Sequence, residues 1–230
     1  NKDSIKINLD VSGVSVKYLS NFPELINGEG TVKITPKNFN GFLDSGKIND
    51  VSIADGNISI NLLSPKKWFA DVEFVGVGKN DDILNILDRR PLNLSENFII
   101  NSDNVKGTSA SRVILGFPVR LDLTFDQLNF GAVSNLKDFG IKNIISNIDL
   151  SDGLMKLNLT NKGLSVEGVG KLNEIETNID WKQDFDHIDE IDLKLHGKTN
   201  AILIKSLGFN FANYIDGEFQ FDINTKLKNN

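Results

Sequence analysis

The sequence predicts a mainly β fold, in which a long antiparallel sheet, curved and twisted, forms an apolar groove and carries one or two short helices. Apolar and polar residues alternate over most of the chain. Because successive side chains of a strand point to opposite faces, each alternating stretch has one apolar and one polar face. This one-sided pattern is typical of antiparallel sheets rather than of buried parallel ones.

The alternating stretches occur from one end of the chain to the other. They place Ile, Leu, Val or Phe between Lys, Asp, Glu, Asn or Gln. The clearest are Ile5–Val11, Ile58–Leu62, Met155–Leu159, Ile175–Trp181, Ile191–Leu195 and Phe219–Leu227. We therefore expect residues 1–230 to form a single elongated β segment, and, since both ends still alternate, we expect this segment to belong to a larger protein.

Three glycines predict turns between strands. Asp55-Gly56 and Asp152-Gly153 lie between alternating runs, and Asp-Gly is a strong hairpin signal because both residues tolerate a left-handed backbone. A third hairpin is expected at Asn161–Gly163, with Gly163 in the left-handed position.

One segment carries a helical pattern. Ile83, Leu84 and Leu87 form an apolar stripe that follows a capping Asn80 or Asp81. After another alternating strand, Gly-Lys, an Asn and a similar stripe occur again near residue 200. Residues 73–95 and 191–220 are therefore a possible internal repeat, with a second short helix in the later copy.

The stretch "FPVRLDLTFDQLNFGA", residues 117–132, predicts a central curved strand. Its apolar residues occupy every second position: Val119, Leu121, Leu123 and Phe125. After these, the apolar residues shift by one position to Leu128 and Phe130, so we expect a β-bulge at Gln127. A bulge bends a strand, and a bent strand suits a sheet that curls around a guest molecule.

Composition excludes several classes of function. The 230 residues are 40% hydrophobic and 24% charged, which is typical of a folded globular protein. The net charge is −6, and no cluster of Lys and Arg exceeds two residues. Both facts argue against a nucleic-acid partner and against strong docking on anionic lipid headgroups. Without cysteine, the chain has no disulfides and no Cys-based metal site.

Candidate catalytic residues are few. His187 and His196 are the only histidines, and they lie in different predicted segments without metal-ligand or catalytic-triad spacing. The acidic run at residues 184–192 lies in a predicted loop and on a wet strand face, so we interpret it as solvated charge. We expect no enzyme activity, no metal and no cofactor. A weaker alternative is a carbohydrate-binding module that uses Trp68 and Trp181.

Longer blocks of the sequence resemble a known family. "GVSVKYLSNFPELINGEGTVKI" and "FNGFLDSGKINDVSIADGNISI" resemble its strand, Pro-turn and hairpin units. "VEFVGVGKNDDILNILDRRPLNL" resembles its strand followed by a short helix, and the block at residues 106–185 resembles its longest run of strands, which ends at a Trp. The chain in these respects resembles the AsmA-like proteins of the bacterial cell envelope, particularly the YhdP/TamB branch, although it is richer in Asn, Lys and Ile than its alanine- and arginine-rich relatives.

This resemblance implies a non-enzymatic module in the periplasm of a Gram-negative bacterium. The module would be tethered to the inner membrane through a segment outside this chain. The resemblance also implies a β-groove with an apolar lining, which takes part in phospholipid transport between the inner and outer membranes or in outer-membrane biogenesis. The implied partners are phospholipid acyl chains, the inner membrane and other envelope proteins.

On this hypothesis the apolar residues of the central strands line the lipid groove. The expected lining residues are Val119, Leu121, Leu123, Phe125, Leu157, Leu159, Val166, Ile179 and Ile223. For each of them, ordinary core packing is an equally good interpretation. The alternative function is a closed β-sandwich scaffold, or an outer-membrane assembly module that pairs with partners through its edge strands.

Overall fold

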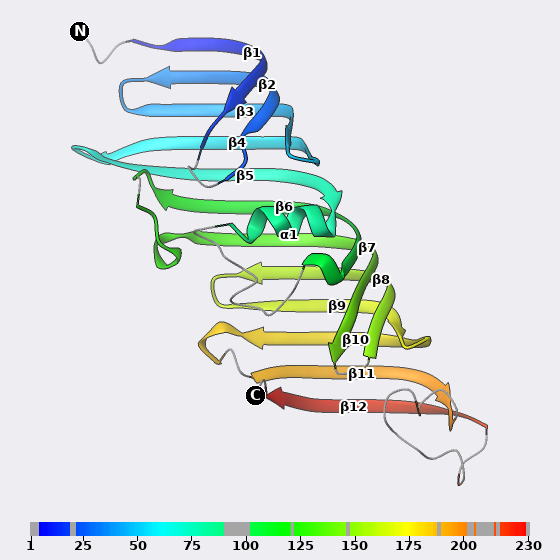
Figure 1. Ribbon diagram of the computed structural model, residues 1–230. Coiled ribbons are helices and arrows are strands. Elements are labelled where there is room, and N and C mark those ends of the chain that lie inside the picture. Colours follow the sequence, from blue (N-terminus) through cyan, green and yellow to red (C-terminus); the bar gives the residue numbers. More distant parts are fainter. Residues whose placement is uncertain are drawn as a thin grey trace. The chain divides into compact units, whose positions relative to one another are not determined.

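The computed structural model describes residues 5–18, 22–89, 102–120, 122–145, 148–187, 190–201, 205, 214 and 217–228 (Figure 1). Twelve strands form one sheet, in which every strand lies beside its neighbours in the sequence, from β1 to β12. The sheet is antiparallel, and the described residues include the α-helix α1, so the prediction of a mainly β, antiparallel fold is confirmed.

The chain divides into two compact units, which are described separately. Unit 1 comprises Asn1–Ser102 and Ala110–Ala132, and unit 2 comprises Asp103–Ser109 and Val133–Asn230. The strand β6 (Val105–Pro118) contributes residues to both units, as does β7 (Asn129–Ile145).

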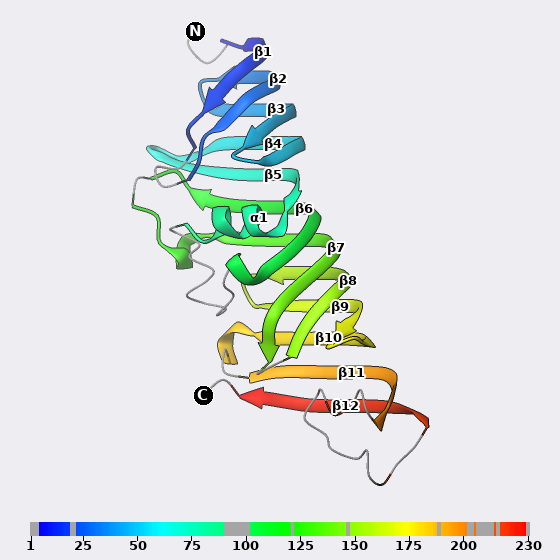
Figure 2. The same cartoon turned by 45° about the vertical axis from the view of Figure 1, so that its right-hand side comes forward.

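Five strands in sequence make up most of unit 1. They are β1 (Ile7–Val16), β2 (Leu25–Thr35), β3 (Asn38–Ile48), β4 (Val51–Ser64) and β5 (Lys67–Lys79). Register shifts interrupt the pairing of β1 with β2 after Val11, and of β2 with β3 after Ile26. Such shifts bend strands, and the ribbons of β1 and β2 are bent in both views (Figures 1 and 2).

The helix α1 (Asn80–Leu87) follows β5 directly. Its Ile83 and Ile86 pack against a buried cluster of Ile48, Val51 and Ile53. The predicted helix is therefore confirmed, but the predicted cap is wrong. Lys79 occupies the N-cap without a side-chain hydrogen bond, and Asn80 is already helical and buried.

Unit 2 is built on five further strands together with part of β7. They are β8 (Ile148–Thr160), β9 (Gly163–Leu172), β10 (Ile175–Asp184), β11 (Glu190–Asn200) and β12 (Glu218–Lys228). In both views, the bent parts of β7 and β8 cross in front of the strands that follow (Figures 1 and 2). Leu136 of β7 and Leu150 of β8 accordingly share one buried cluster with Leu193 and Phe221 of the last two strands.

Only part of the possible internal repeat lies within the described residues. The strand β5 and the helix α1 supply its first copy, whereas β11 supplies only the strand of the second. The second stripe, at residues 202–207, lies almost wholly outside the described residues.

The predicted strand from Val119 to Phe125 is wrong. The strand β6 ends at Pro118, and a 3₁₀ turn at Phe125–Gln127 stands where we expected a β-bulge. The Thr124 side chain accepts a hydrogen bond from the Gln127 backbone, and the Gln127 side chain accepts one from the Thr124 N–H, 3.3 Å away. This reciprocal capping box satisfies backbone groups locally, so the segment needs no neighbouring strand.

Both predicted Asp-Gly turns are also wrong. Gly56 lies inside β4 and Gly153 inside β8, in each case beside a register shift. Asp152 has a φ of 51°, so its left-handed backbone serves a bulge within the strand. The hairpin at residues 160–163 is confirmed, but Gly163 begins β9 and is not in the left-handed region.

Candidate functional site: an apolar face on the sheet

The first five strands place their apolar side chains in register on one face of unit 1. The cross-strand rows are Ile7–Ile34–Phe39–Ile60–Ala70, Leu9–Val32–Gly41–Ile58–Val72 and Val11–Gly30–Leu43–Gly56–Phe74. We call this surface the unit 1 apolar face. It arises because each strand alternates with period two and because the registers bring like positions together.

The unit 1 apolar face is only half-covered. Ile7 and Leu9 on the edge strand are 44% and 45% exposed. Val32, Phe39 and Ile58 in the strands behind them are half-buried. A contiguous group of partly exposed apolar side chains is typical of a binding surface, whereas single exposed apolar residues are common on any protein.

The opposite face of the same strands is polar. Its rows are Asn8–Lys33–Asn40–Ser59–Asp71 and Asp10–Thr31–Phe42–Asn57–Glu73. Ser59 donates to the Oδ1 atom of Asn40 at 2.9 Å, and Arg112 of β6 pairs with Glu73. Phe42 is the apolar exception, and the Lys33 ammonium lies 5.6 Å from its ring centroid. Unit 1 is therefore amphipathic as a sheet, with a wet side and an apolar side.

Unit 2 also gathers apolar side chains on one face, but there they are packed. Five of the expected lining residues lie on this face: Leu157, Leu159, Val166, Ile179 and Ile223. Ile179 is only 6% exposed, and its neighbours Ile175 and Thr177 are 1% and 0% exposed. Leu157, Val166 and Ile223 are half-buried and pack against the same cluster. Around Ile175 and Ile179 this surface of unit 2 is therefore a packed core.

Glycines allow that core to close. The Phe221 ring lies over Gly197, where an added Cβ atom would come within 2.8 Å of the ring carbons. Gly170 similarly receives the side chains of Leu150 and Met155. Both glycines stand opposite Thr177 across their ladders. Large side chains therefore fill the space above the glycines, and the strands approach closely around Thr177.

The other expected lining residues lie in unit 1, after the end of β6. Val119 is 49% exposed, Leu123 and Phe125 are half-buried, and Leu121 lies outside the described residues. The buried residues of this stretch are Leu128 and Phe130, which the structure packs at 5% and 7% exposure. The Phe125 and Phe130 rings lie 5.3 Å apart.

A salt bridge shapes the same stretch. The Arg120 guanidinium donates to both carboxylate oxygens of Asp122, at 2.8 and 2.6 Å. This hydrogen bond from Arg120 lowers the pKa of Asp122, and the same hydrogen bond raises the pKa of Arg120. Both side chains are solvent-exposed, so this bidentate pair is a surface salt bridge within the loop. Neither of the two side chains belongs to a buried site.

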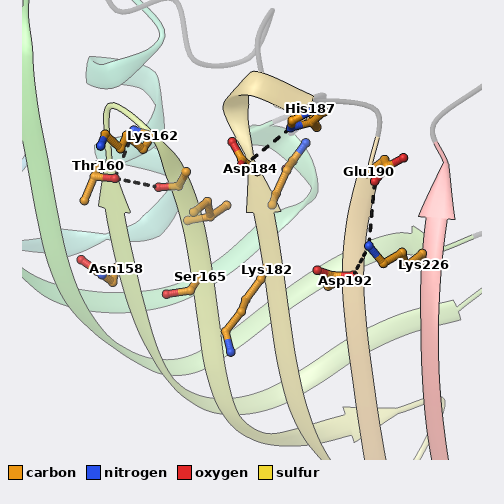
Figure 3. A pocket seen from close by; sticks show the side chains of 13 residues that line it. Asn158, Thr160, Lys162, Ser165, Lys182, Asp184, His187, Glu190, Asp192 and Lys226 are labelled. Atoms are coloured by element: carbon orange, nitrogen blue, oxygen red, sulfur yellow. Dashed lines mark hydrogen bonds and ion pairs between the residues drawn. The ribbon is translucent and has the colours of Figure 1, made fainter.

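A polar depression of about 470 Å³ lies on the other side of unit 2 (Figure 3). One cross-strand row crosses its floor: Asn158–Ser165–Lys182–Asp192–Lys226. Lys226 approaches Asp192 at 3.6 Å and Glu190 at 4.0 Å, and His187 lies 4.0 Å from Asp184. The charge of Lys226 is therefore paired with two carboxylates within the protein.

Titratable side chains do not converge on a catalytic arrangement in the part of the chain that the structure describes. No group of three or more His, Asp or Glu residues there could hold a metal ion. His196 Nδ1 lies 2.6 Å from Asp222 Oδ1 as an exposed cross-strand pair on neighbouring strands. Within the same described ranges, no helix has the length and apolar character to cross a membrane.

Comparison with family models, with curated proteins and with solved structures finds no match to this chain. The apolar face of unit 1 is therefore the candidate site on its geometry alone. Sequence reasoning identified the alternation of Ile5–Val11 and Ile58–Leu62 but placed the lining further along the chain. Alternation shows which face of a strand is apolar. Whether that face is exposed depends on which other strands or helices pack over it, and short sequence motifs do not reveal this.

Proposed function

We propose that this chain is a non-enzymatic module that holds phospholipid acyl chains on the unit 1 apolar face. The observation that carries the proposal is the set of registered apolar rows across β1–β5, with side chains still partly open to solvent. The resemblance to AsmA-like envelope proteins supports the same function. It extends the proposal to phospholipid transport between the inner and outer membranes, in the periplasm, by a protein tethered to the inner membrane.

The dimensions of the face suit an acyl chain. Four spacings of about 4.8 Å between neighbouring strands give a width of roughly 19 Å across β1–β5. One leaflet of a bilayer has a hydrocarbon thickness of roughly 15 Å, half of the whole core. A single acyl chain can therefore lie across the rows with its whole length in contact with apolar side chains.

The energetics favour an extended apolar surface over a polar pocket. Each methylene that leaves a bilayer needs about 0.8 kcal/mol of apolar contact to avoid a penalty. Rows of Ile, Val and Phe provide such contact in small, similar increments. A lipid held in this way can slide, because no single contact must break at high cost, and its headgroup stays in water at the margin of the face.

A matched pair of variants on β3 tests this proposal. Phe39 lies on the unit 1 apolar face, half-buried between Ile34 and Ile60, and its neighbour Asn40 lies on the polar face. We expect Phe39→Asp to reduce phospholipid bound to the purified protein, measured by native mass spectrometry, by about tenfold. This estimate follows from the loss of roughly 1.5 kcal/mol or more of apolar contact.

Asn40→Asp is the control. It adds the same charge, keeps the oxygen that accepts from Ser59, and faces Lys33 across the ladder. We expect this variant to retain bound phospholipid. The proposal fails if the wild-type protein purified from bacterial cells carries no phospholipid, or if both variants lose it equally while circular dichroism shows that they are folded.

A second function, a structural scaffold, is favoured by the packed face of unit 2. Ile175, Thr177 and Leu193 are at most 3% exposed, so this unit supplies rigidity and leaves little room for a guest. On this alternative the chain acts in outer-membrane assembly through partner proteins. Normal phospholipid content in Phe39→Asp, together with a partner protein recovered from cells by cross-linking, favours the scaffold over the lipid module.

A further inference from the structure

The hairpin that joins β4 to β5 extends beyond the neighbouring strand β3 of unit 1. The strand β3 begins opposite Asn61, whereas β4 continues to Ser64 before the chain turns back into β5. Figure 1 draws this hairpin in cyan, and its end projects past the end of β3. We call residues 62–68 the hairpin tip.

The hairpin tip is apolar on both faces. Leu62 pairs with Trp68 on the side that continues the unit 1 apolar face from Ile60. Leu63, the next residue along β4, points to the opposite side and is 69% exposed. Val119, whose N–H donates to the Trp68 carbonyl at 2.9 Å, is 49% exposed. A partner that covers only one face of the sheet would therefore leave either Leu63 or Trp68 in water.

Two lysines occupy the turn of the hairpin tip. Lys66 and Lys67 are both exposed, and neither forms a salt bridge within the described ranges. Lys66 follows Pro65 and has a φ of 67°, as at the third position of a type II turn, where Gly or Asn is usual. A long side chain is uncommon in this strained backbone conformation. The turn thus presents two cations beside an exposed apolar tip.

We propose that the hairpin tip docks on the surface of a phospholipid bilayer. Leu62 and Leu63 enter the boundary between headgroups and acyl chains. The Trp68 ring lies at the level of the headgroups, where Trp is enriched because its apolar body carries a polar N–H. The lysine ammonium groups reach back to the lipid phosphates, while their aliphatic stems cover apolar surface. A bilayer encloses the tip on both faces, which suits its two-sided apolar character.

Apolar contact supplies the binding in this arrangement. The phosphates that Lys66 and Lys67 reach are present in neutral as well as in anionic phospholipids. The net charge of −6 opposes approach to an anionic surface, so the two local cations orient the tip, and its buried apolar area holds it there. This inference rests on the hairpin tip and stands whether or not the unit 1 apolar face holds lipid.

Vesicles of phosphatidylcholine test the proposal, by flotation and by tryptophan fluorescence. The chain has two tryptophans, so Trp181→Phe leaves Trp68 as the only reporter. We expect added vesicles to shift the Trp68 emission to the blue, and lipid brominated on its acyl chains to quench it. Leu63→Asp should weaken vesicle binding by about tenfold or more, because a carboxylate replaces a side chain that the bilayer buries.

Leu154→Asp is the matched control. Leu154 is also an exposed leucine, at 57%, but it lies on β8 in unit 2, opposite Val169. We expect this variant to bind vesicles as the wild type does. Equal binding by Leu63→Asp and Leu154→Asp, with both folded by circular dichroism, overturns the proposal. So does a wild-type chain that does not float with vesicles, or Trp68 emission that vesicles neither shift nor quench.

Docking and lipid holding are measured separately. A chain that floats with vesicles but purifies without phospholipid supports docking by the hairpin tip and contradicts only the proposed function. A chain that purifies with phospholipid but does not float supports the proposed function and overturns docking. In that case the exposed tip is assigned to a protein partner instead.

Discussion

Tyr18 contributes a pH-dependent part of the stability of unit 1. Its ring packs beside the buried cluster of Ile48, Val51 and Ile53, 6.1 Å from the Phe22 ring. Burial raises the pKa of the Tyr18 phenol to about 12, and the positive charge of Arg89 partly opposes this shift. In the unfolded chain the phenol ionises near its usual pKa of about 10. The folded state therefore holds a proton that the unfolded state has already lost in the range between these two values.

We expect stability to fall as the pH rises from about 10 to about 12. The unfolded state binds fewer protons in that range, so the free energy of unfolding decreases with pH, by up to about 2.5 kcal/mol in total. Urea unfolding of the wild type and of Tyr18→Phe at several pH values measures this. The Phe variant should lack this part of the decrease. Parallel curves for the two proteins across this range would contradict the assignment.

At the scale of the element, β10 should be far less tolerant of charge than β3. Ile179 of β10 is 6% exposed and lies between Gly168 and Leu195. A carboxylate there would be buried without a partner, so we expect Ile179→Asp to lower the free energy of unfolding by about 4 kcal/mol or more. Chemical denaturation followed by circular dichroism measures the change.

The matched control is Asn178→Asp, one residue away on the exposed side of β10. Asn178 donates a single exposed hydrogen bond to the His196 carbonyl at 3.4 Å, so the control should cost less than about 1 kcal/mol. Equal stability of the two variants would mean that the face of unit 2 is open, and that Ile179 lines a groove as the sequence first suggested.

Strands were easier to predict than the turns between them. Period-two alternation identified the N-terminal and C-terminal strands because a half-buried ladder imposes that spacing on every residue. Asp152-Gly153 misled because Asp152 adopts, within a bulge, the same left-handed backbone as a tight turn, whereas Asp55-Gly56 lies beside a register shift inside β4. The β3–β4 turn instead uses Asn49, with a φ of 51°, which alternation alone could not reveal.

The stretch at residues 117–132 shows where alternation gives a false strand. Polar residues at every second position also suit a surface loop, in which Arg120 binds Asp122 and leaves both side chains in water. The decisive signal was Thr124 followed by Gln127, which is the capping-box spacing. The candidate site could be predicted only in part. The sequence shows which residues are apolar, but it does not show which bent strands pack over them.

At the scale of the whole molecule, the two units use one sequence pattern for different purposes. Both place alternating apolar residues on one side of the sheet. In unit 2, the bent parts of β7 and β8 bring Leu136 and Leu150 over that side, and the residues beneath are buried. In unit 1, α1 packs against the cluster of Ile48, Val51 and Ile53, and the larger apolar side chains of the rows stay partly exposed, although Ala70 of β5 is buried. Bending, which comes from bulges and glycines, thus separates a core from a candidate binding surface.

Charge at this scale leads to a prediction about lipid transfer. The chain carries a net charge of −6, and no cluster of Lys and Arg exceeds two residues. Polybasic proteins gain about 1 kcal/mol for each basic residue near an anionic membrane, and salt screens that attraction. This chain lacks such an attraction, so the lipid binding that we propose would have to come from apolar contact, which added salt does not weaken.

If the chain moves lipid as proposed, we expect the rate at which it transfers a fluorescent phospholipid between vesicles to change less than twofold between about 50 and about 500 mM NaCl. Over this range the screening length falls from above about 10 Å to well below it. Replacing neutral donor lipid by anionic lipid should not raise the rate, because a net negative protein is repelled by anionic headgroups. Phe39→Asp measured in the same assay sets the baseline. Transfer that rises with anionic lipid and collapses in salt would mean that headgroup charge holds the lipid, and the apolar rows of unit 1 would then have another role.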